Sequence, residues 1–308
     1  MVALLFPGQG SQSVGMGKEL AAAFPVARQT FDEADEALGV ALSRIAWEGP
    51  EDELTATLNA QPALLVHSVA VLRVVEEKLG PVAYAAGHSL GEFSAHVAAG
   101  TLEFADAVRA VRRRGELMFK SGTERPGAMA AVLGADDETI VRVCEQVSAA
   151  GDGVVVPANF NSPGQVVISG DVAAVERAME ALKAGGAKRA LRLNVSGAFH
   201  SPLMEVAKAG LREHLTTVDF HAPRFPVVSN VTAEPVDDTE IARRVLVDQL
   251  TSPVRWTASM QKLIELGVTR FVELGNGNVL AGLLKRIDRS ALATSIAGPD
   301  DVAALDAA

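Results

Sequence analysis

Short continuous apolar runs alternate with helical patterns through the first third of the chain. Residues 2–6 and 82–86 are apolar runs that end in glycine-containing turns, which is typical of buried parallel strands. Helical spacing of apolar residues predicts helices over about 16–24, 25–38, 60–79, 92–99 and 102–119. The helix over 60–79 is apolar nearly all round, carries Pro62 in its first turn and is expected to lie centrally. This alternation predicts an α/β core with a mainly parallel sheet.

A different order of elements occupies residues 126–195. The segments AMAAVLG, VVVPANF, QVVISG and AKRALRLNV are predicted strands, and DDETIVRVCEQVSAA and DVAAVERAMEALKAGG are predicted helices. Their order along the chain is β-α-β-β-α-β, as in a small ferredoxin-like unit. Residues 126–195 are therefore expected to form a ferredoxin-like subdomain. It is inserted into an α/β core made of residues 1–125 and 196–308.

The last third of the chain returns to the pattern of the core. Helices are predicted near 202–216, 238–250, 256–266 and 278–287, with strands at 225–230 and 269–275. The final stretch, SIAGPDDVAALDAA, carries little pattern and is expected to be loosely held.

Composition and charge exclude several classes of protein. The chain has 308 residues, 48% hydrophobic and 21% charged, which suffices for a large buried core. A formal net charge of -10 without a long basic run argues against nucleic-acid binding. The single cysteine, Cys144, cannot form an internal disulfide and is expected to be buried and unreactive. The chain opens without a signal-like segment and shows no uninterrupted membrane span, so a cytoplasmic protein without membrane contact is expected.

The pentapeptide GHSLG at 87–91 follows the apolar run 82–86 and precedes a predicted helix. In that setting Gly-x-Ser-x-Gly forms a nucleophile elbow, a sharp turn that presents a serine at the end of a hydrolase-like sheet. Ser89 is thus the candidate nucleophile. The alternative is a serine that only caps the following helix.

A nucleophilic serine needs a base, and one histidine is best placed to serve. The chain contains His67, His88, His96, His200, His214 and His221. His200 lies in a glycine-containing loop between the two expected domains, where clefts usually form. No persuasive acid completes a hydrolase-type triad. A Ser89–His200 dyad, with the histidine oriented by a backbone carbonyl, is therefore the preferred hypothesis.

The loop FPGQGSQ after the first strand is expected to meet Ser89 at the same sheet edge. Its two glycines allow backbone N–H groups to turn toward a reacting carbonyl. The N–H groups of Gln9 and Leu90 are the predicted oxyanion donors. A phosphate-binding loop is the weaker alternative because no Gly-Lys-Ser/Thr follows.

Arg114 occupies an unusual place in the predicted helix over 102–119. Helical spacing aligns it with an apolar stripe made of Ala107, Ala110, Val111 and Met118. A buried guanidinium requires an anionic partner, and its planar fork suits a carboxylate. That partner is either a substrate carboxylate or an internal acid, and the spacing does not choose between them.

Motifs spread over almost the whole chain resemble malonyl-CoA:acyl carrier protein transacylases, a family close to the acyltransferase domains of polyketide synthases. In order, they are FPGQGSQ at 6–12, QPALL at 61–65, GHSLGE at 87–92, RRGELM at 113–118, NFNSPGQVVISG at 159–170, GAFHSPLM at 197–204, QLTSPVRW at 249–256 and FVELG at 271–275.

The resemblance implies a ping-pong reaction through a malonyl-serine. Malonyl-CoA is the donor, and the phosphopantetheine thiol of an acyl carrier protein is the acceptor. The implied roles are nucleophile for Ser89, base for His200, carboxylate binding for Arg114 and oxyanion support for Gln9. No permanently bound cofactor and no metal are implied, and a monomer is expected.

Three further residues are expected at the substrate site on the same resemblance. Gln249 belongs to a region that supports the histidine, and Asn159 opens the motif at 159–170. Phe199 matches the malonyl-type motif, and its ring should disfavour methylmalonyl by about 1–3 kcal/mol.

One loop departs from the family pattern. Many relatives have Pro-Gly-Lys after FVELG, whereas this chain has Asn276-Gly277-Asn278. If that loop supplied the carbonyl that orients His200, its geometry would be altered.

Three other functions share some of these features. A malonyl transferase that serves a polyketide synthase in trans would use the same chemistry. A serine esterase or thioesterase would release the acyl group to water, and a docking module would lack catalysis.

Overall fold

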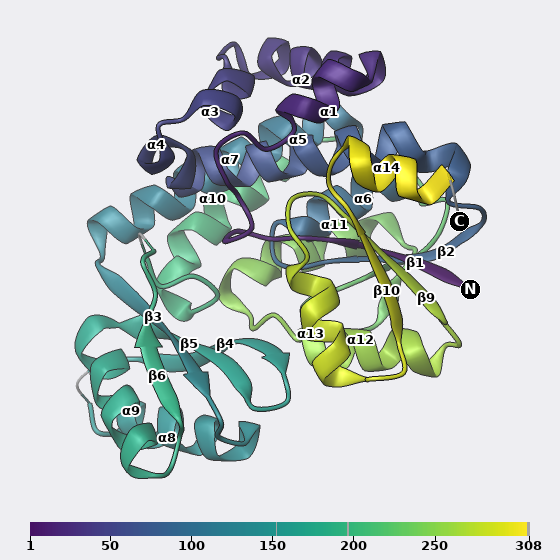
Figure 1. Ribbon diagram of the computed structural model, residues 1–308. Helices are drawn as coiled ribbons and strands as arrows, with labels where there is room; N and C mark the ends of the chain where they lie inside the picture. Colours follow the sequence, from purple (N-terminus) through teal and green to yellow (C-terminus); the bar gives the residue numbers. More distant parts are fainter. Residues whose placement is uncertain (152, 196, 307–308) are drawn as a thin grey trace.

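The computed structural model describes residues 1–151, 153–195 and 197–306. It contains a six-stranded sheet flanked by helices and a separate four-stranded sheet with two helices of its own (Figure 1). The strands of the large sheet are β1 (Val2–Phe6), β2 (Val82–Gly87), β7 (Val227–Val228), β8 (Pro235–Val236), β9 (Arg270–Leu274) and β10 (Leu292–Ile296). Their spatial order is β10-β9-β1-β2-β7-β8, and every pair is parallel except β7 with β8. The predicted α/β core with a mainly parallel sheet is therefore confirmed.

The helices around the large sheet follow the predicted pattern with three additions. They are α1 (Lys18–Ala23), α2 (Pro25–Leu38), α3 (Leu42–Glu48), α4 (Glu51–Thr55), α5 (Thr57–Val75), α6 (Gly91–Ala99), α7 (Phe104–Glu124), α10 (Glu205–Leu215), α11 (Thr239–Asp248), α12 (Trp256–Glu265), α13 (Val279–Ile287) and α14 (Pro299–Asp306). The three additions are α3, α4 and α14, which the sequence pattern does not predict because helices of five to eight residues show too few turns for a clear period.

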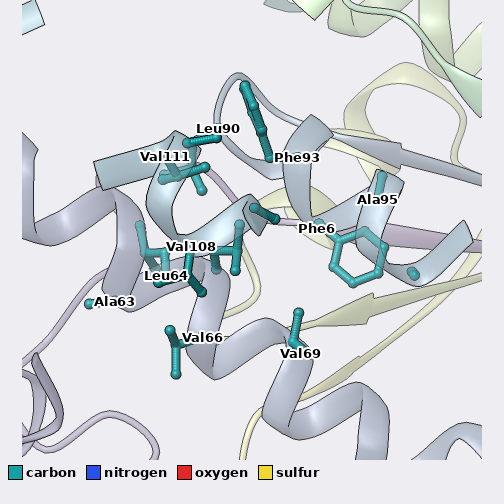
Figure 2. Close-up of a cluster of buried hydrophobic side chains, with 14 of the residues drawn as sticks. Phe6, Ala63, Leu64, Val66, Val69, Leu90, Phe93, Ala95, Val108 and Val111 are labelled. Carbon is teal, nitrogen blue, oxygen red and sulfur yellow. The ribbon is translucent and has the colours of Figure 1, made fainter. Parts of the chain in front are cut away.

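The central strand β1 feeds two apolar cores, one on each face of the sheet. Leu4 and Phe6 belong to the core that includes residues of α5 and α7, whereas Ala3 and Leu5 pack with residues of α12 and α13. Figure 2 shows Phe6 among side chains of the first core. Burial of both faces explains why this strand is apolar throughout. Phe6 pairs with Gly87 of β2, so the loops that follow these two strands begin at the same sheet edge.

Helix α5 begins earlier than predicted, and Pro62 consequently lies inside it rather than in its first turn. Proline has no N–H to donate to the carbonyl of Leu58, four residues before it. Arg112 Nη1 donates to that carbonyl at 3.1 Å and supplies the missing partner. By length and composition α5 could span a membrane, yet 83% of its apolar window is buried inside the protein. It is the central core helix that the sequence predicts.

The small sheet is built from residues 127–192. Its strands are β3 (Gly127–Leu133), β4 (Val155–Ser162), β5 (Gln165–Asp171) and β6 (Arg189–Arg192), and its helices are α8 (Asp137–Ala149) and α9 (Val172–Ala184). All three strand pairs are antiparallel, in the order β4-β5-β3-β6. Cys144 is buried in the separate core of this unit, as expected. The predicted chain order of four strands and two helices is confirmed.

The expectation of a loosely held C-terminal tail is wrong for the described residues. Strand β10 pairs with β9 along five residues, and Ile296 and Val302 are buried in the main core. The Asp301 carboxylate accepts hydrogen bonds from the N–H groups of Ala297 and Gly298, which fixes the start of α14. Strand β10 escaped prediction because its first residues are exposed at the sheet edge, so no apolar run marks it. Positions 307 and 308 lie outside the described residues.

A pair of glycine substitutions should change stability in opposite directions. A Cβ on Gly91 would lie 2.2 Å from the carbonyl oxygen of Phe6, whereas one on the exposed Gly282 in α13 meets no heavy atom within 4 Å. Gly91→Ala should lower the free energy of unfolding by more than about 2 kcal/mol, while Gly282→Ala should raise it by about 0.5–1 kcal/mol. Denaturant unfolding measures both, and equal effects would contradict the contact at Gly91.

The buried His96 of α6 should make the fold sensitive to acid. Neither ring nitrogen has a partner among the described residues, and burial lowers the pKa of His96 to about 3. Below pH 6.5 His96 becomes protonated in the unfolded chain but stays neutral in the folded chain. The free energy of unfolding therefore falls as the pH is lowered. The difference in free energy of unfolding between His96→Leu and the parent should therefore be about 2 kcal/mol more favourable to the variant at pH 5 than at pH 7.5.

The exposed His221 provides the matched control for this measurement, and His221→Leu should show no such pH-dependent gain. Denaturant titrations at the two pH values give the comparison. A His96→Leu variant that is as acid-sensitive as the parent would contradict the assignment.

Candidate active site

Ser89 sits at the tip of a tight turn between β2 and α6. Its φ of 53° is a left-handed value that non-glycine residues rarely adopt and that concentrates at functional sites. A Cβ on Gly87 would lie 1.9 Å from the carbonyl carbon of Gly91, so strand and helix approach too closely for any larger residue. The structure thus contains the strained strand-turn-helix that the pentapeptide predicts, with Ser89 at the edge where β1 also ends.

Asn230 fixes the turn from the next strand. Its side-chain oxygen accepts from the backbone N–H of Ser89 at 2.7 Å, and its Nδ2 donates to the carbonyl of Gly87 at 2.7 Å. The residue is fully buried just after β7. The sequence pattern does not predict this role, although a polar residue at the end of the strand predicted over 225–230 is a usable signal.

His200 is hydrogen-bonded to Ser89 and to a backbone carbonyl. Ser89 Oγ lies 2.8 Å from His200 Nε2, and His200 Nδ1 lies 2.9 Å from the carbonyl oxygen of Gln249. A carbonyl can only accept, so Nδ1 carries the proton and Nε2 accepts from the serine hydroxyl. Burial, reinforced by the charge of Arg114, lowers the pKa of His200 to about 3. The imidazole is therefore neutral at pH 7, and its Nε2 lone pair faces the serine hydroxyl.

The altered loop Asn276-Gly277-Asn278 does not supply the carbonyl that orients His200. That carbonyl belongs to Gln249. Asn276 instead contacts the loop after β1, where its Nδ2 donates to the carbonyl of Ser11 at 2.6 Å and to Ser13 Oγ at 2.9 Å. The departure from the family pattern thus leaves the histidine support intact.

Arg114 lies buried beside the serine, at 1% exposure. Its Nη2 donates to Ser89 Oγ at 3.0 Å and to Gln249 Oε1 at 2.9 Å, and its Nη1 donates to Gln61 Oε1. Within the described part of the chain it forms no ion pair, and its Nε–H has no partner. Burial lowers the pKa of Arg114 to about 10, so the group stays charged at pH 7. The Glu92 carboxylate acts on the guanidinium electrostatically and opposes this lowering of its pKa. The hydrogen-bond acceptors of the guanidinium are all neutral oxygens, so it is equipped to receive an anion.

A chain of hydrogen bonds connects Arg114 to the loop after β1. Gln61 Nε2 donates to Thr57 Oγ1 at 2.7 Å, and Thr57 Oγ1 donates to Gln9 Oε1 at 2.8 Å. The backbone N–H groups of Gln9 and Leu90 make no hydrogen bond to any described residue. Both remain free to bind an oxyanion. The sequence pattern predicts no role for Gln61 or Thr57, because neither carries an obvious reactive group.

The predicted residues surround one cavity of about 400 Å³ between the two sheets. Its walls include Gln9, Ser89, Leu90, Arg114, Phe199 and His200 from the larger unit, and Met129, Asn159, Asn161 and Val167 from the smaller one. Gln249 is fully buried behind Ser89 and does not line the cavity. His88 also faces it, with Nε2 2.8 Å from Asn161 Oδ1, and sequence analysis had not placed either side chain there. The described residues contain no group of three acids, histidines or cysteines able to hold a metal.

Strand β4 joins the two units next to this cavity. The N–H of Phe160 donates to the carbonyl of Val254 at 2.9 Å, and the N–H of Val254 donates to the carbonyl of Ala158 at 2.8 Å. These bonds hold Asn159 in place at the wall of the cavity.

The sequence and the fold both match known acyltransferases. A family model described as an acyl transferase domain matches residues 3–298. The malonyl CoA-acyl carrier protein transacylase of Bacillus subtilis is 48% identical over 98% of this chain and 95% of its own length. Its counterpart in Escherichia coli is 48% identical, with 98% and 97% covered.

Solved structures give the same result. The malonyl-CoA:acyl carrier protein transacylase of Xanthomonas oryzae superposes with a TM-score of 0.95 at 48% identity, covering 99% of this chain and 98% of that one. A malonyl transacylase bound to the acyl carrier protein of a type II polyketide synthase superposes equally well, at 47% identity with 100% and 99% covered. This chain therefore belongs to the acyl transferase domain family.

Proposed function

We propose that the protein transfers a malonyl group from malonyl-CoA to the phosphopantetheine thiol of an acyl carrier protein, in fatty-acid biosynthesis. The observation that carries this proposal is the buried guanidinium of Arg114, which lies 3.0 Å from Ser89 Oγ and forms no ion pair with any residue that the structure describes. An acyl group that bears a carboxylate can pair with this positive charge. The related transacylases are named for malonyl, which is such an acyl group.

The first half-reaction loads Ser89. Its Oγ attacks the thioester carbonyl of malonyl-CoA while His200 Nε2 takes the hydroxyl proton. The oxyanion of the tetrahedral intermediate accepts hydrogen bonds from the N–H groups of Gln9 and Leu90. Collapse breaks the carbon–sulfur bond, and the proton on His200 leaves with the CoA thiol. The Gln249 carbonyl stabilises the imidazolium between these two events.

The second half-reaction is the reverse with a new thiol. His200 takes the proton of the phosphopantetheine thiol, and the phosphopantetheine sulfur attacks the malonyl-serine ester. The ester bond to Ser89 Oγ breaks, and the proton returns from His200 to this oxygen. Water is the competing acceptor. A cavity already occupied by the clamped acyl group and the pantetheine arm limits its access.

Arg114 selects the acyl group. In the free enzyme its Nη2 donates to Ser89 Oγ, and acylation turns that oxygen into a poorer acceptor. The malonyl carboxylate then takes up the guanidinium donors through two parallel hydrogen bonds. The Phe199 ring at the cavity wall disfavours a methyl group on the substrate α-carbon, and Asn159 contacts the substrate from the smaller unit.

We also assign the finer architecture. Residues 1–125 and 196–308 are taken as a hydrolase-like core, a division supported by the strained turn at Ser89. Residues 126–195 are taken as a ferredoxin-like subdomain, supported by the order β4-β5-β3-β6 and a separate apolar core. A cytoplasmic location and a monomeric state complete the proposal.

Intact-mass measurement after mixing with malonyl-CoA tests the loading step. The parent protein should gain one malonyl group, and Ser89→Ala should gain none. Ser94→Ala is the matched control, because Ser94 is a fully buried serine of the same helix region and should leave labelling intact. Labelling that survives in Ser89→Ala would refute the proposed nucleophile.

Selectivity for the acyl group tests the clamp. Arg114→Ala should reduce the kcat/KM of loading from malonyl-CoA by about 100-fold or more, because the malonyl carboxylate loses a buried charged partner. Loading from acetyl-CoA should fall far less, so the malonyl-to-acetyl ratio collapses. Arg114→Lys should recover only part of the ratio, since an ammonium lacks the planar fork.

The neighbouring Arg113 serves as control for the clamp. Its side chain is 49% exposed and faces Glu116, so Arg113→Ala should leave the malonyl-to-acetyl ratio unchanged. Competition between the two acyl-CoA donors, followed by mass spectrometry, gives the ratio directly. A parent-like ratio in Arg114→Ala would mean that another group binds the carboxylate.

A further inference from the structure

A fully buried carboxylate lies one turn after the nucleophile. Glu92 is 0% exposed, and among the described residues it forms no ion pair. Its Oε2 accepts from Gln249 Nε2 at 2.7 Å and from the backbone N–H of Asn230 at 3.1 Å, while Oε1 has no described partner. Burial raises the pKa of Glu92 to about 7, against the opposing effects of its hydrogen bonds to Asn230 and Gln249 and of the Arg114 charge. Such a group is expensive to bury, and the two residues it holds both touch the catalytic turn.

Glu92 determines which way the Gln249 amide faces. Gln249 Oε1 accepts from Arg114 Nη2 at 2.9 Å, and Nε2 donates to Glu92 and, at 3.0 Å, to the carbonyl of Ser89. Turning the amide over would place its NH₂ against the guanidinium, so that donor would face donor. In its ionised form Glu92 accepts from the NH₂ and repels the amide oxygen, which favours the observed orientation.

The same carboxylate acts on the serine and the histidine. The backbone carbonyl of Gln249 accepts from His200 Nδ1 at 2.9 Å. Asn230, whose N–H donates to Glu92, accepts from the N–H of Ser89 at 2.7 Å. Three parts of the site, the base, the nucleophilic turn and the guanidinium, therefore share one buried acceptor.

A purely structural role predicts different behaviour. An acid in the first turn of α6 stabilises the helix through its negative charge, and aspartate would do so as well. Orienting Gln249 depends on reach instead: glutamine preserves the length of the side chain and one acceptor, whereas aspartate retracts the carboxylate by one methylene.

We infer that Glu92 is a positioning residue, which orients the Gln249 amide and thereby sets Arg114 to receive the acyl carboxylate. This inference rests on the proposed function. Through the carbonyl of the same Gln249, it also helps to hold His200.

The test is the malonyl-to-acetyl ratio of kcat/KM for loading Ser89, which does not depend on the folded fraction. Glu92→Leu should lower this ratio about tenfold. Glu92→Gln should lower it less than Glu92→Asp, although only aspartate keeps the charge. The reverse order, or equal losses of malonyl and acetyl loading in all three variants, would overturn the inference and leave a structural role.

A double-mutant cycle with Gln249→Leu tests the route. If Glu92 acts through Gln249, Glu92→Leu should change the ratio less than about twofold in the Gln249→Leu background. If Glu92→Leu lowered the malonyl-to-acetyl ratio as much in the Gln249→Leu background as in the parent, Glu92 would not act through Gln249. Should Glu92→Leu fail to fold, Glu92→Asp replaces it in the cycle. Parent protein that never becomes malonylated would defeat the proposed function itself, whereas a malonylated parent with unaffected variants would defeat only the role of Glu92.

Discussion

The buried positive charge of Arg114 is the constraint on which the site depends. The guanidinium sits inside the core with neutral oxygens of Gln61, Ser89 and Gln249 around it and no ion-paired acid among the described residues. Such an arrangement is unfavourable in an empty protein and becomes favourable when a carboxylate enters. On the proposed function, it costs stability before the substrate binds, and it gives selectivity for a charged acyl group afterwards.

The fold explains how this charge comes to lie beside the nucleophile. Strands β1 and β2 end at the same level, which brings the oxyanion loop and the serine turn together. Helix α7 runs beside α5, so its apolar stripe faces inward and carries Arg114 into the core. The four-stranded unit then closes the cavity, with Asn159 held beside Val254 by paired backbone bonds. The contacts between β1 and β2, between α5 and α7, and between Asn159 and Val254 all join residues that lie far apart in the sequence.

The parts of the site that the sequence predicts are those marked by local patterns. Glycine spacing marks the turn at Ser89, and helical spacing places Arg114 on a buried stripe. Asn230 and the carbonyl of Gln249 are different, because their roles depend on where β7 and the end of α11 pack against the turn. A pattern of side chains gives no information about which backbone carbonyl contacts His200. The sequence therefore predicts that some carbonyl orients the histidine, but not that Gln249 supplies it. Likewise, β10 is a mostly exposed edge strand whose place is set by pairing with β9.

The place of a triad acid beside His200 Nδ1 is taken by the carbonyl of Gln249, which agrees with the proposed transfer between thiols. In the proposed mechanism, a neutral His200 held by this carbonyl accepts and returns a proton, and Arg114 holds the malonyl group until the second thiol arrives. The lifetime of the malonyl-enzyme therefore tests this claim most directly. Malonyl-enzyme freed of CoA should persist in buffer and discharge rapidly when an acyl carrier protein bearing phosphopantetheine is added. Equal rates of loss with and without the carrier protein would contradict it and identify a hydrolase.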